Sequence, residues 1–188
     1  MTAEPIRVQV GQPGLVVLLG AAGSGKTTLA RRLFTPDEII SSDDLRAAIS
    51  GDSADQRVTR PAFAILHREL GRRLAGGRLA VVDATNVERS ARRALLQRAT
   101  VAGAPAIALV LALPADVVHT RNAARPGGPV PRDVVDRHLG LVAGLLADGD
   151  HAAIETLTGE GFAGVVILRI DDDLARLRID RRPAVSRR

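Results

Sequence analysis

Residues 15–28 constrain this chain more than any other stretch, because an apolar run leads directly into a glycine-rich loop and then into a helical pattern. Four residues separate Gly20 from Gly25, and Lys26 and Thr27 follow at once, so the stretch has the full spacing of a phosphate-binding loop. Glycine permits positive φ, which lets consecutive backbone N–H groups point at phosphate oxygens. The stretch therefore predicts a nucleoside triphosphate site at a helix N-terminus.

Side chains of this loop have chemical roles of their own. Lys26 would place a point charge on the β- and γ-phosphates, and the Thr27 hydroxyl would ligate Mg²⁺. Lys26 is the only lysine among 26 basic residues, which suggests that an ammonium group is required at this position. The residues expected to bind the nucleotide in this loop are Gly20, Gly23, Ser24, Gly25, Lys26, Thr27 and Thr28.

Composition limits the class of protein. The 188 residues are enough for one domain with a buried core, and we treat residues 1–188 as a single domain. The chain has no cysteine, which excludes disulfides and thiolate metal sites. No apolar run approaches the ~18 residues of a membrane span, so we expect a cytoplasmic protein with no membrane partner. The net charge of +5 favours polyanionic partners, but the absence of Trp and Tyr argues against an aromatic stacking surface for nucleic acid.

Strand and helix patterns alternate along the chain. This alternation predicts an α/β fold, a three-layer sandwich of the P-loop NTPase type with a central, mainly parallel sheet and a helical lid at about residues 115–147. A polar loop is expected at 51–59, and Ser42 or Asp43 is expected to cap the helix that begins there. Residues 176–188 carry six arginines and are interpreted as a solvated basic tail. The expected strands are 7–10, 15–19, 38–41, 79–82, 107–113 and 165–170.

A second set of polar residues follows the predicted strand at 38–41. Asp43 and Arg46 are three residues apart in the first turn of a helix, hence on one face, whereas Asp44 points elsewhere. A carboxylate can accept the proton of an attacking hydroxyl, and a guanidinium can hold a phosphate of the acceptor. The alternative is that Asp43 caps the helix and pairs with Arg46 on the surface.

The predicted strand at 79–82 is followed by Asp83, beside the phosphate-binding loop, where a carboxylate commonly holds a metal-bound water. Further along, Arg121 and Arg125 lie four residues apart on one helical face, directly before a Pro-Gly-Gly-Pro sequence that would serve as a hinge. Closure of such a lid would bring a guanidinium to the transferring phosphate. The alternative is a solvated arginine pair at a helix end.

Five sequence elements occur in an order and at spacings that resemble the 5′-hydroxyl polynucleotide kinases, most closely the kinase module of bacterial RNA end-healing and sealing enzymes. The resemblance covers residues 15–170. Its elements are the loop at 20–28, Ile-Ser-Ser-Asp-x-x-Arg at 40–46, Asp-Gln-x-Val-Thr at 55–59, Val-Val-Asp-Ala-Thr-Asn-Val at 81–87 and Arg-Asn-x-x-Arg at 121–125.

The resemblance implies ATP as the donor, Mg²⁺ as the cofactor and a 5′-hydroxyl end of RNA or DNA as the acceptor. It implies that Asp43 is the general base and that Arg46 contacts the phosphate next to that end. Arg121 is similar to the lid arginine that clamps the transferring phosphates, with Arg125 beside it. In that family the kinase is fused to phosphatase and ligase modules, for which this chain has no residues. It therefore resembles a free-standing kinase or one part of a split repair system with separate partner proteins.

Two other functions would use the same residues. In the first, the chain is a kinase of a small-molecule hydroxyl, such as a sugar, nucleoside or antibiotic, and differs only in the pocket near Arg46. In the second, it is an NTP-driven switch or a binding subunit. The sequence identifies no reader of the 2′-hydroxyl, so the choice between RNA and DNA stays open, as does the oligomeric state.

Overall fold

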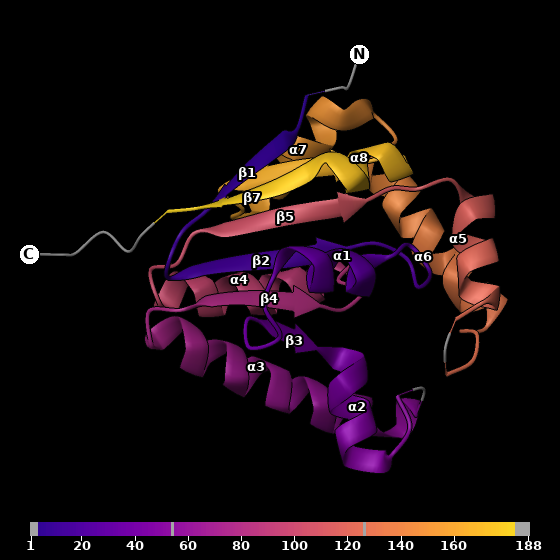
Figure 1. Cartoon of the computed structure of the whole chain (residues 1–188), viewed down its shortest axis with the longest axis horizontal. Coiled ribbons are helices and arrows are strands. Elements are labelled where there is room, and N and C mark those ends of the chain that lie inside the picture. The colour runs from indigo at the N-terminus through magenta and orange to yellow at the C-terminus, as the bar shows by residue number, and fades with distance from the viewer. Residues whose placement is uncertain (1–3, 54, 126, 183–188) are drawn as a thin grey trace, which may run out of the picture.

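A five-stranded parallel sheet forms the centre of the molecule (Figure 1). The computed structural model describes residues 4–53, 55–125 and 127–182. The strand order is β3-β4-β2-β5-β6, in which all neighbours are parallel. This confirms the predicted P-loop NTPase-type α/β fold. The strands are β2 (Gly14–Leu19), β3 (Ile39–Ser41), β4 (Leu79–Asp83), β5 (Ala106–Leu111) and β6 (Gly164–Leu168).

β2 shows why the sheet needs cover on both faces. Every residue of this strand is buried. Because successive side chains of a strand point to opposite faces, Leu15, Val17 and Leu19 join one apolar cluster while Val16 and Leu18 join another. A near-continuous apolar strand is what a parallel sheet with two covered faces requires.

Three helices cover one face of the sheet: α3 (Thr59–Ala75), α4 (Arg89–Val101) and α7 (Gly149–Glu160). Leu66, Leu70 and Leu74 recur every four residues on α3, and all three are buried against the sheet. Burying each of these leucines contributes roughly 2 kcal/mol to folding. Between α7 and β6, Phe162 fills the end of the same cluster.

The opposite face is covered by α1 (Lys26–Leu33), α8 (Asp171–Arg176) and a second, two-stranded parallel sheet. This small sheet pairs β1 (Ile6–Val10) with β7 (Leu177–Arg181), so the two ends of the described chain lie side by side (Figure 1). The expectation of a solvated tail from residue 176 is wrong for residues 176–181. Leu177 and Ile179 alternate with charged residues, and this period of two sends Leu177 into the core. Residues 183–188 lie outside the described part of the chain.

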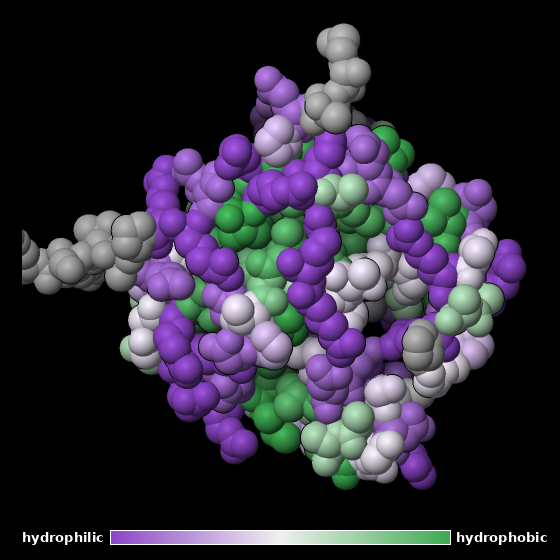
Figure 2. All heavy atoms as spheres, viewed as in Figure 1, coloured by the Kyte–Doolittle hydropathy of each residue, from purple (hydrophilic) through white to green (hydrophobic). Residues whose placement is uncertain are grey.

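Two helices lie in the range 115–147, where a lid is predicted: α5 (Ala115–Ala123) and α6 (Arg132–Leu145). We call them the lid helices, and their role as a lid stays a prediction. Val118 of α5 and Val135 of α6 are buried against Ala21 and Ala22 of the phosphate-binding loop. The space-filling view is hollowed beside the lid, where it faces the rest of the molecule (Figure 2).

No helix in the described ranges is both long enough and apolar enough to span a bilayer.

Two local features after β3 differ from expectation. α2 (Ser42–Ser50) is capped by Ser41, whose hydroxyl accepts the Asp44 N–H at 3.2 Å, so neither Ser42 nor Asp43 is the cap. This leaves the Asp43 carboxylate available for other contacts. The segment predicted as a loop contains a 3-10 turn, η1 (Gln56–Val58), which Asp55 caps by accepting the Arg57 N–H at 2.9 Å.

Candidate active site

The carboxyl ends of three neighbouring strands carry the predicted site residues. The phosphate-binding loop follows β2, Asp83 ends β4, and Ser41 at the end of β3 pairs in register with Asp83. Parallel α/β sheets bind ligands at this edge. The topology therefore brings together the residues predicted to bind the nucleotide and those predicted to bind the acceptor, which are far apart in sequence.

The phosphate-binding loop has the backbone of an anion cradle. Gly23 and Gly25 have φ values of 87° and 92°, the left-handed region that glycine tolerates best. Gly25 is also the N-cap of α1, where no side chain caps the helix and no acidic residue lies in the first turn. The first N–H groups of α1 are thus left for an external anion, whose charge the helix dipole favours. Thr28, in the first turn of α1, is exposed at the mouth of this cradle.

Lys26 is buried at the centre of the site. Its Nζ donates to the carbonyl oxygens of Gly20 at 2.9 Å and Ala21 at 2.7 Å. Burial lowers the pKa of Lys26 to about 8, and the nearby carboxylates of Asp83 and Asp43 partly oppose this shift. An ammonium group that is buried without a paired carboxylate gains most from a phosphate, which would supply the missing negative charge.

Asp83 and Thr27 fit a divalent cation. Asp83 is only 4% exposed, and burial raises its pKa above the usual range although Lys26 and a hydrogen bond from Thr27 act in the opposite direction. A hydroxyl and a carboxylate are oxygen ligands of the kind that Mg²⁺ prefers. A metal ion here would favour the ionised carboxylate, which burial alone disfavours.

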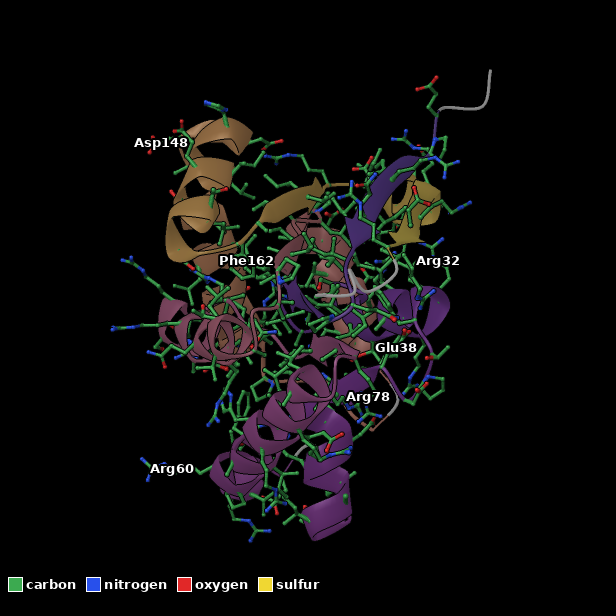
Figure 3. The ribbon with its side chains drawn as sticks, turned by 90° about the vertical axis from the view of Figure 1, so that its left-hand side faces the viewer. Arg32, Glu38, Arg60, Arg78, Asp148 and Phe162 are labelled. Atoms are coloured by element: carbon green, nitrogen blue, oxygen red, sulfur yellow. The ribbon has the colours of Figure 1, made fainter. Side chains whose placement is uncertain are left out.

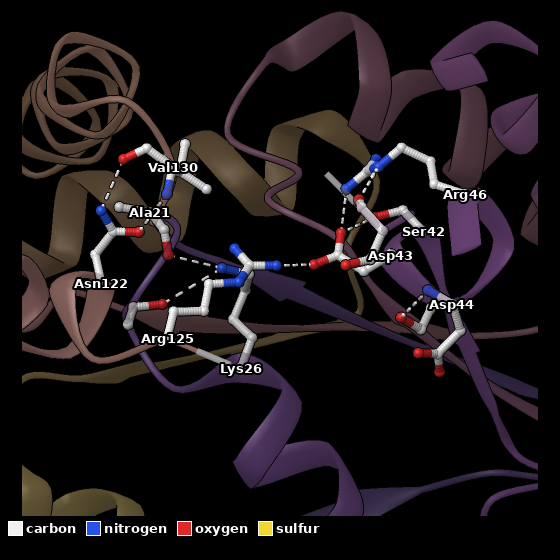
Figure 4. Close-up of polar contacts among 12 residues, drawn as sticks. Ala21, Lys26, Ser42, Asp43, Asp44, Arg46, Asn122, Arg125 and Val130 are labelled. Carbon is white, nitrogen blue, oxygen red and sulfur yellow. Dashed lines mark hydrogen bonds and ion pairs between the residues drawn. The ribbon is translucent and has the colours of Figure 1, made fainter. Parts of the chain in front are cut away.

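Asp43 is the meeting point of two arginines (Figure 4). Arg46, one turn along α2, forms an ion pair with one carboxylate oxygen, and Arg125 pairs with the other. Because α5 ends at Ala123, Arg125 lies after the helix, and the prediction that it shares a helical face with Arg121 is wrong. Arg46 is 9% exposed and also donates from Nε to the Ser53 carbonyl at 2.7 Å. The predicted pairing of Asp43 with Arg46 is present, but it lies in the site and not on an open surface.

Asp44, in contrast, points away from the site. Its side chain is 67% exposed, and its nearest cation is Arg31 at 3.7 Å. The expected difference between the two adjacent carboxylates is therefore confirmed.

Arg121, the other arginine predicted for the lid, lies beside the phosphate-binding loop. A Cβ atom at Gly25 would be 3.4 Å from Nη1 of Arg121, so this guanidinium borders the place where phosphates are expected. Its Nη2 donates to Asp171 at the start of α8 at 2.5 Å. Arg121 and Arg125 thus reach the two sides of the site: one the nucleotide loop, the other the acceptor carboxylate.

The connection between the two lid helices is held by one residue. The Asn122 side chain donates to the Val130 carbonyl at 2.8 Å and accepts the Val130 N–H at 3.1 Å, which closes the chain on itself across the predicted hinge. Gly127 and Gly128 both have positive φ, while Pro126 of the same sequence lies outside the described residues. Asn122 received no role from the sequence because its partners are backbone groups.

Asn86 and Arg92 form a support that sequence reasoning missed. Asn86 has φ 47° and donates from Nδ2 to the Leu18 carbonyl at 2.8 Å, just before the phosphate-binding loop. Arg92, 5% exposed, donates to the Val87 carbonyl at 2.7 Å and forms two hydrogen bonds of 2.7 Å with Glu160 of α7. The only signal in the sequence is an asparagine after a strand end, a residue type that tolerates positive φ.

Residues 15–144 match the family model AAA_33, described as an AAA domain. The chain belongs to this family. The matched region holds the phosphate-binding loop, the Asp43 element, Asp83 and both lid arginines. No curated protein matches the chain in sequence.

Several solved structures share the fold of this chain. A protein of the Pnkp1/Rnl/Hen1 RNA repair complex has a TM-score of 0.62 at 22% identity, covering 79% of this chain and 48% of that chain. Kti12 from Chaetomium thermophilum in complex with ADP-AlF3 has a TM-score of 0.61 at 20% identity, covering 86% and 92%. A sugar kinase from Janibacter sp. HTCC2649 has a TM-score of 0.51 at 21% identity, covering 83% and 84%. The fold is that of P-loop kinases, which act on different acceptors.

Proposed function

We propose that the chain is an ATP-dependent kinase that transfers the γ-phosphate of ATP to the 5′-hydroxyl end of RNA or DNA. The observation that carries this proposal is the placement of Asp43. Its carboxylate lies within electrostatic range of Lys26 and is oriented by Arg46 and Arg125. A proton acceptor and a phosphate cradle therefore face one another at the same edge of the sheet.

The donor half of the site binds ATP. Lys26 and the N–H groups at the start of α1 hold the phosphates, with Gly20, Gly23, Ser24, Gly25 and Thr28 forming the cradle. Thr27 and Asp83 would hold Mg²⁺, which would supply charge neutralisation at the phosphate oxygens. Ser24 is fully buried under the loop, so we expect its role to be in shaping the loop.

The acceptor half performs the proton transfer. The 5′-hydroxyl oxygen forms a bond to the γ-phosphorus as the bond from that phosphorus to the leaving oxygen of ADP breaks, and Asp43 accepts the hydroxyl proton. Arg46 holds the phosphate next to the reacting end. Arg121 and Arg125 stabilise the negative charge that is shared among the transferring oxygens.

A polynucleotide acceptor is supported by the order of the sequence elements at 40–46, 55–59, 81–87 and 121–125. It is also supported by the fold shared with a protein of an RNA repair complex, although this chain spans about half of that protein. Separate phosphatase or ligase proteins would then carry out the other steps of end repair.

A second candidate is phosphorylation of a small-molecule hydroxyl. The specific observation in its favour is the narrow acceptor side: Arg46 binds the Ser53 carbonyl, and a Cβ atom at Gly127 would be 3.6 Å from the Ser53 hydroxyl. The loop after α2 and the hinge of the lid thus approach each other over Asp43. The shared fold with a sugar kinase agrees with this candidate.

The test is transfer of labelled γ-phosphate from ATP, with Mg²⁺, to 5′-hydroxyl RNA and DNA oligonucleotides and to a panel of small hydroxyl compounds. Asp43→Asn serves as the blank. Label at the oligonucleotide 5′ end that is lost in the variant would support the proposal. Label on a small compound alone would favour the second candidate, and no label in either arm would contradict both.

A further inference from the structure

The positive charge of this protein is concentrated on two neighbouring helices. α3 and α4 together carry eight arginines and a single carboxylate, Glu69, so these 30 residues hold a net charge of +7, against +5 for the whole chain. The remainder of the chain is therefore slightly acidic. Such a distribution creates a local attraction for polyanions that the net charge alone does not describe.

Half of these arginines are neutralised locally. Arg72 and Arg73 both pair with Glu69, Arg92 is buried against Glu160, and Arg89 lies 3.6 Å from the same carboxylate. The other four have no ion pair within the described ranges, and all four are exposed. We call this set the α3–α4 arginine face: Arg60, Arg68, Arg93 and Arg98.

The arginine face begins at the segment that follows α2, the helix that carries Asp43 and Arg46. Arg60 lies in the first turn of α3, which begins where η1 ends, a few residues after the Ser53 carbonyl that binds Arg46. It points away from the ribbon into solvent (Figure 3). Arg68 follows two turns later, about 12 Å along the helix at 1.5 Å per residue.

The other two arginines of the face, Arg93 and Arg98, belong to α4. Arg98 reaches over α3, because a Cβ atom at Gly71 would be 3.8 Å from its Nη1. Arg93 and Arg98 also line a shallow surface hollow with Gln97 and Thr100, with the apolar Leu96 and Val101, and with Glu160, whose carboxylate pairs with Arg92. The four arginines are therefore distributed over both helices, from the first turn of α3 to the last turns of α4.

We infer that the α3–α4 arginine face binds the backbone of a single nucleic-acid strand downstream of the 5′ end that is phosphorylated. This inference rests on the proposed function and specifies the acceptor as a strand several nucleotides long. Guanidinium groups bind phosphate with two parallel hydrogen bonds, which suits a repeating phosphate backbone. The chain has no Trp or Tyr, and the four residues that define the face are all arginines that would contact phosphates. We therefore expect binding that is independent of base sequence.

The test uses 5′-hydroxyl oligonucleotides of 2, 4, 8 and 16 nucleotides and the double variant Arg68→Glu/Arg98→Glu. We expect KM of the unaltered protein to fall with length, and this gain to be lost in the variant while KM for ATP and for the dinucleotide is unchanged. Binding of the 16-mer, followed by fluorescence anisotropy, should weaken about fifty-fold between 50 and 200 mM salt if four phosphates are neutralised.

The matched control is Arg178→Glu/Arg182→Glu, which makes the same change of charge at exposed positions in and after β7. An equal loss in the control, or length dependence that survives in the Arg68→Glu/Arg98→Glu variant, would overturn the inference. Binding of polyglutamate with no binding of oligonucleotide would overturn it in favour of an acidic protein partner. Failure of the proposed function is distinguishable, because then no oligonucleotide of any length acquires label.

Discussion

Arg125, two residues after the end of α5, and Asp43, in the first turn of α2, form an ion pair across the candidate site although they are 82 residues apart in sequence. The same carboxylate pairs with Arg46. Asp43 therefore joins the lid to the acceptor side of the site. An acceptor hydroxyl can reach the carboxylate only by sharing it with, or displacing, one of these guanidinium groups.

We expect Asp43→Asn to lower the rate of phosphoryl transfer by about 10²- to 10⁴-fold, the usual contribution of a general base. Asparagine keeps the size of the side chain but cannot accept the proton. Binding of ADP, followed by calorimetry, should change little, because Asp43 does not belong to the nucleotide cradle. Asp44→Asn, one residue away and exposed, is the control. Equal loss in both variants would show that Asp43 has no special role.

Arg125→Gln should lower kcat for transfer by about 10²-fold or more, since the variant removes a cation from the transferring phosphate. Arg132→Gln, an exposed arginine on the second lid helix, should retain full activity. The measurement is steady-state transfer to a 5′-hydroxyl oligonucleotide at saturating ATP. If kcat is unchanged and only the acceptor KM rises, Arg125 acts in binding alone.

Nucleotide affinity should depend on pH through Lys26, whose pKa is lowered to about 8. As the pH rises above 8, the unliganded protein loses this proton, and the charged hydrogen bond to phosphate must then be formed by taking the proton up again. We expect ADP affinity to fall and binding to take up protons in this range. Calorimetry in two buffers of different ionisation enthalpy measures the uptake, and Lys26→Met should show none.

The free energy of unfolding should also depend on pH through Lys26, but it should rise with pH where the ADP affinity falls. Between pH 8 and 10.5 the unfolded chain holds a proton on Lys26 that the folded chain has released, so the free energy of unfolding rises with pH in this window. The rise relative to Lys26→Met is at most about 3 kcal/mol, from 1.36 kcal/mol per pKa unit. Urea denaturation of both proteins at pH 7.5 and pH 10 tests it. A constant difference between the two proteins would mean that the Lys26 pKa is unshifted.

The pair of Arg92 and Glu160 should be a major contributor to stability. Both side chains are nearly fully buried, and removing one partner leaves an uncompensated charge. We expect Glu160→Ala to destabilise the fold by about 3 kcal/mol or more. Glu155→Ala, on the same helix but exposed, should change stability by less than about 1 kcal/mol. Thermal denaturation of the two variants is sufficient to compare them.

Gly23→Ala should abolish nucleotide binding. The residue has φ 87°, and an added Cβ would lie 2.6 Å from the Val118 carbonyl of the lid, so both the loop and the helix above it must shift. Gly77→Ala has a similar φ of 71° but open space around the new Cβ, and it should cost only about 1 kcal/mol. ADP binding by the first variant at normal affinity would contradict the expected role of this close approach.

The sequence predicted the central sheet and the nucleotide loop because both depend on local pattern. An apolar run before a glycine loop, as at residues 15–28, leaves few alternatives. The ion pair of Asp43 with Arg125 could not be predicted, since it depends on where the lid lies relative to α2. The roles of Arg92 and Asn122 could not be predicted for related reasons: Arg92 pairs with Glu160, which is 68 residues away, and Asn122 binds backbone groups, which leave no mark in the amino-acid sequence.

The arginine-rich segment from residue 176 contains strand β7, which was not predicted from the sequence. Six arginines suggested a solvated end, yet Leu177 and Ile179 are spaced by two, and their burial decides the outcome for residues 177–181. Two apolar residues in register with β1 outweigh exposed charges that can remain in water on the other face. Alternation is thus the more informative signal where it competes with net charge.

The pairing of β1 with β7 has a consequence for synthesis of the chain. The partner of Ile6 in this ladder is Leu177, which is 171 residues later in the sequence. During synthesis β1 must therefore wait, with its apolar side chains uncovered, until β7 has been translated. Contacts between residues so distant in sequence form slowly and late. The phosphate-binding loop depends on β2, β4 and β5, so it can be assembled before β7 is made.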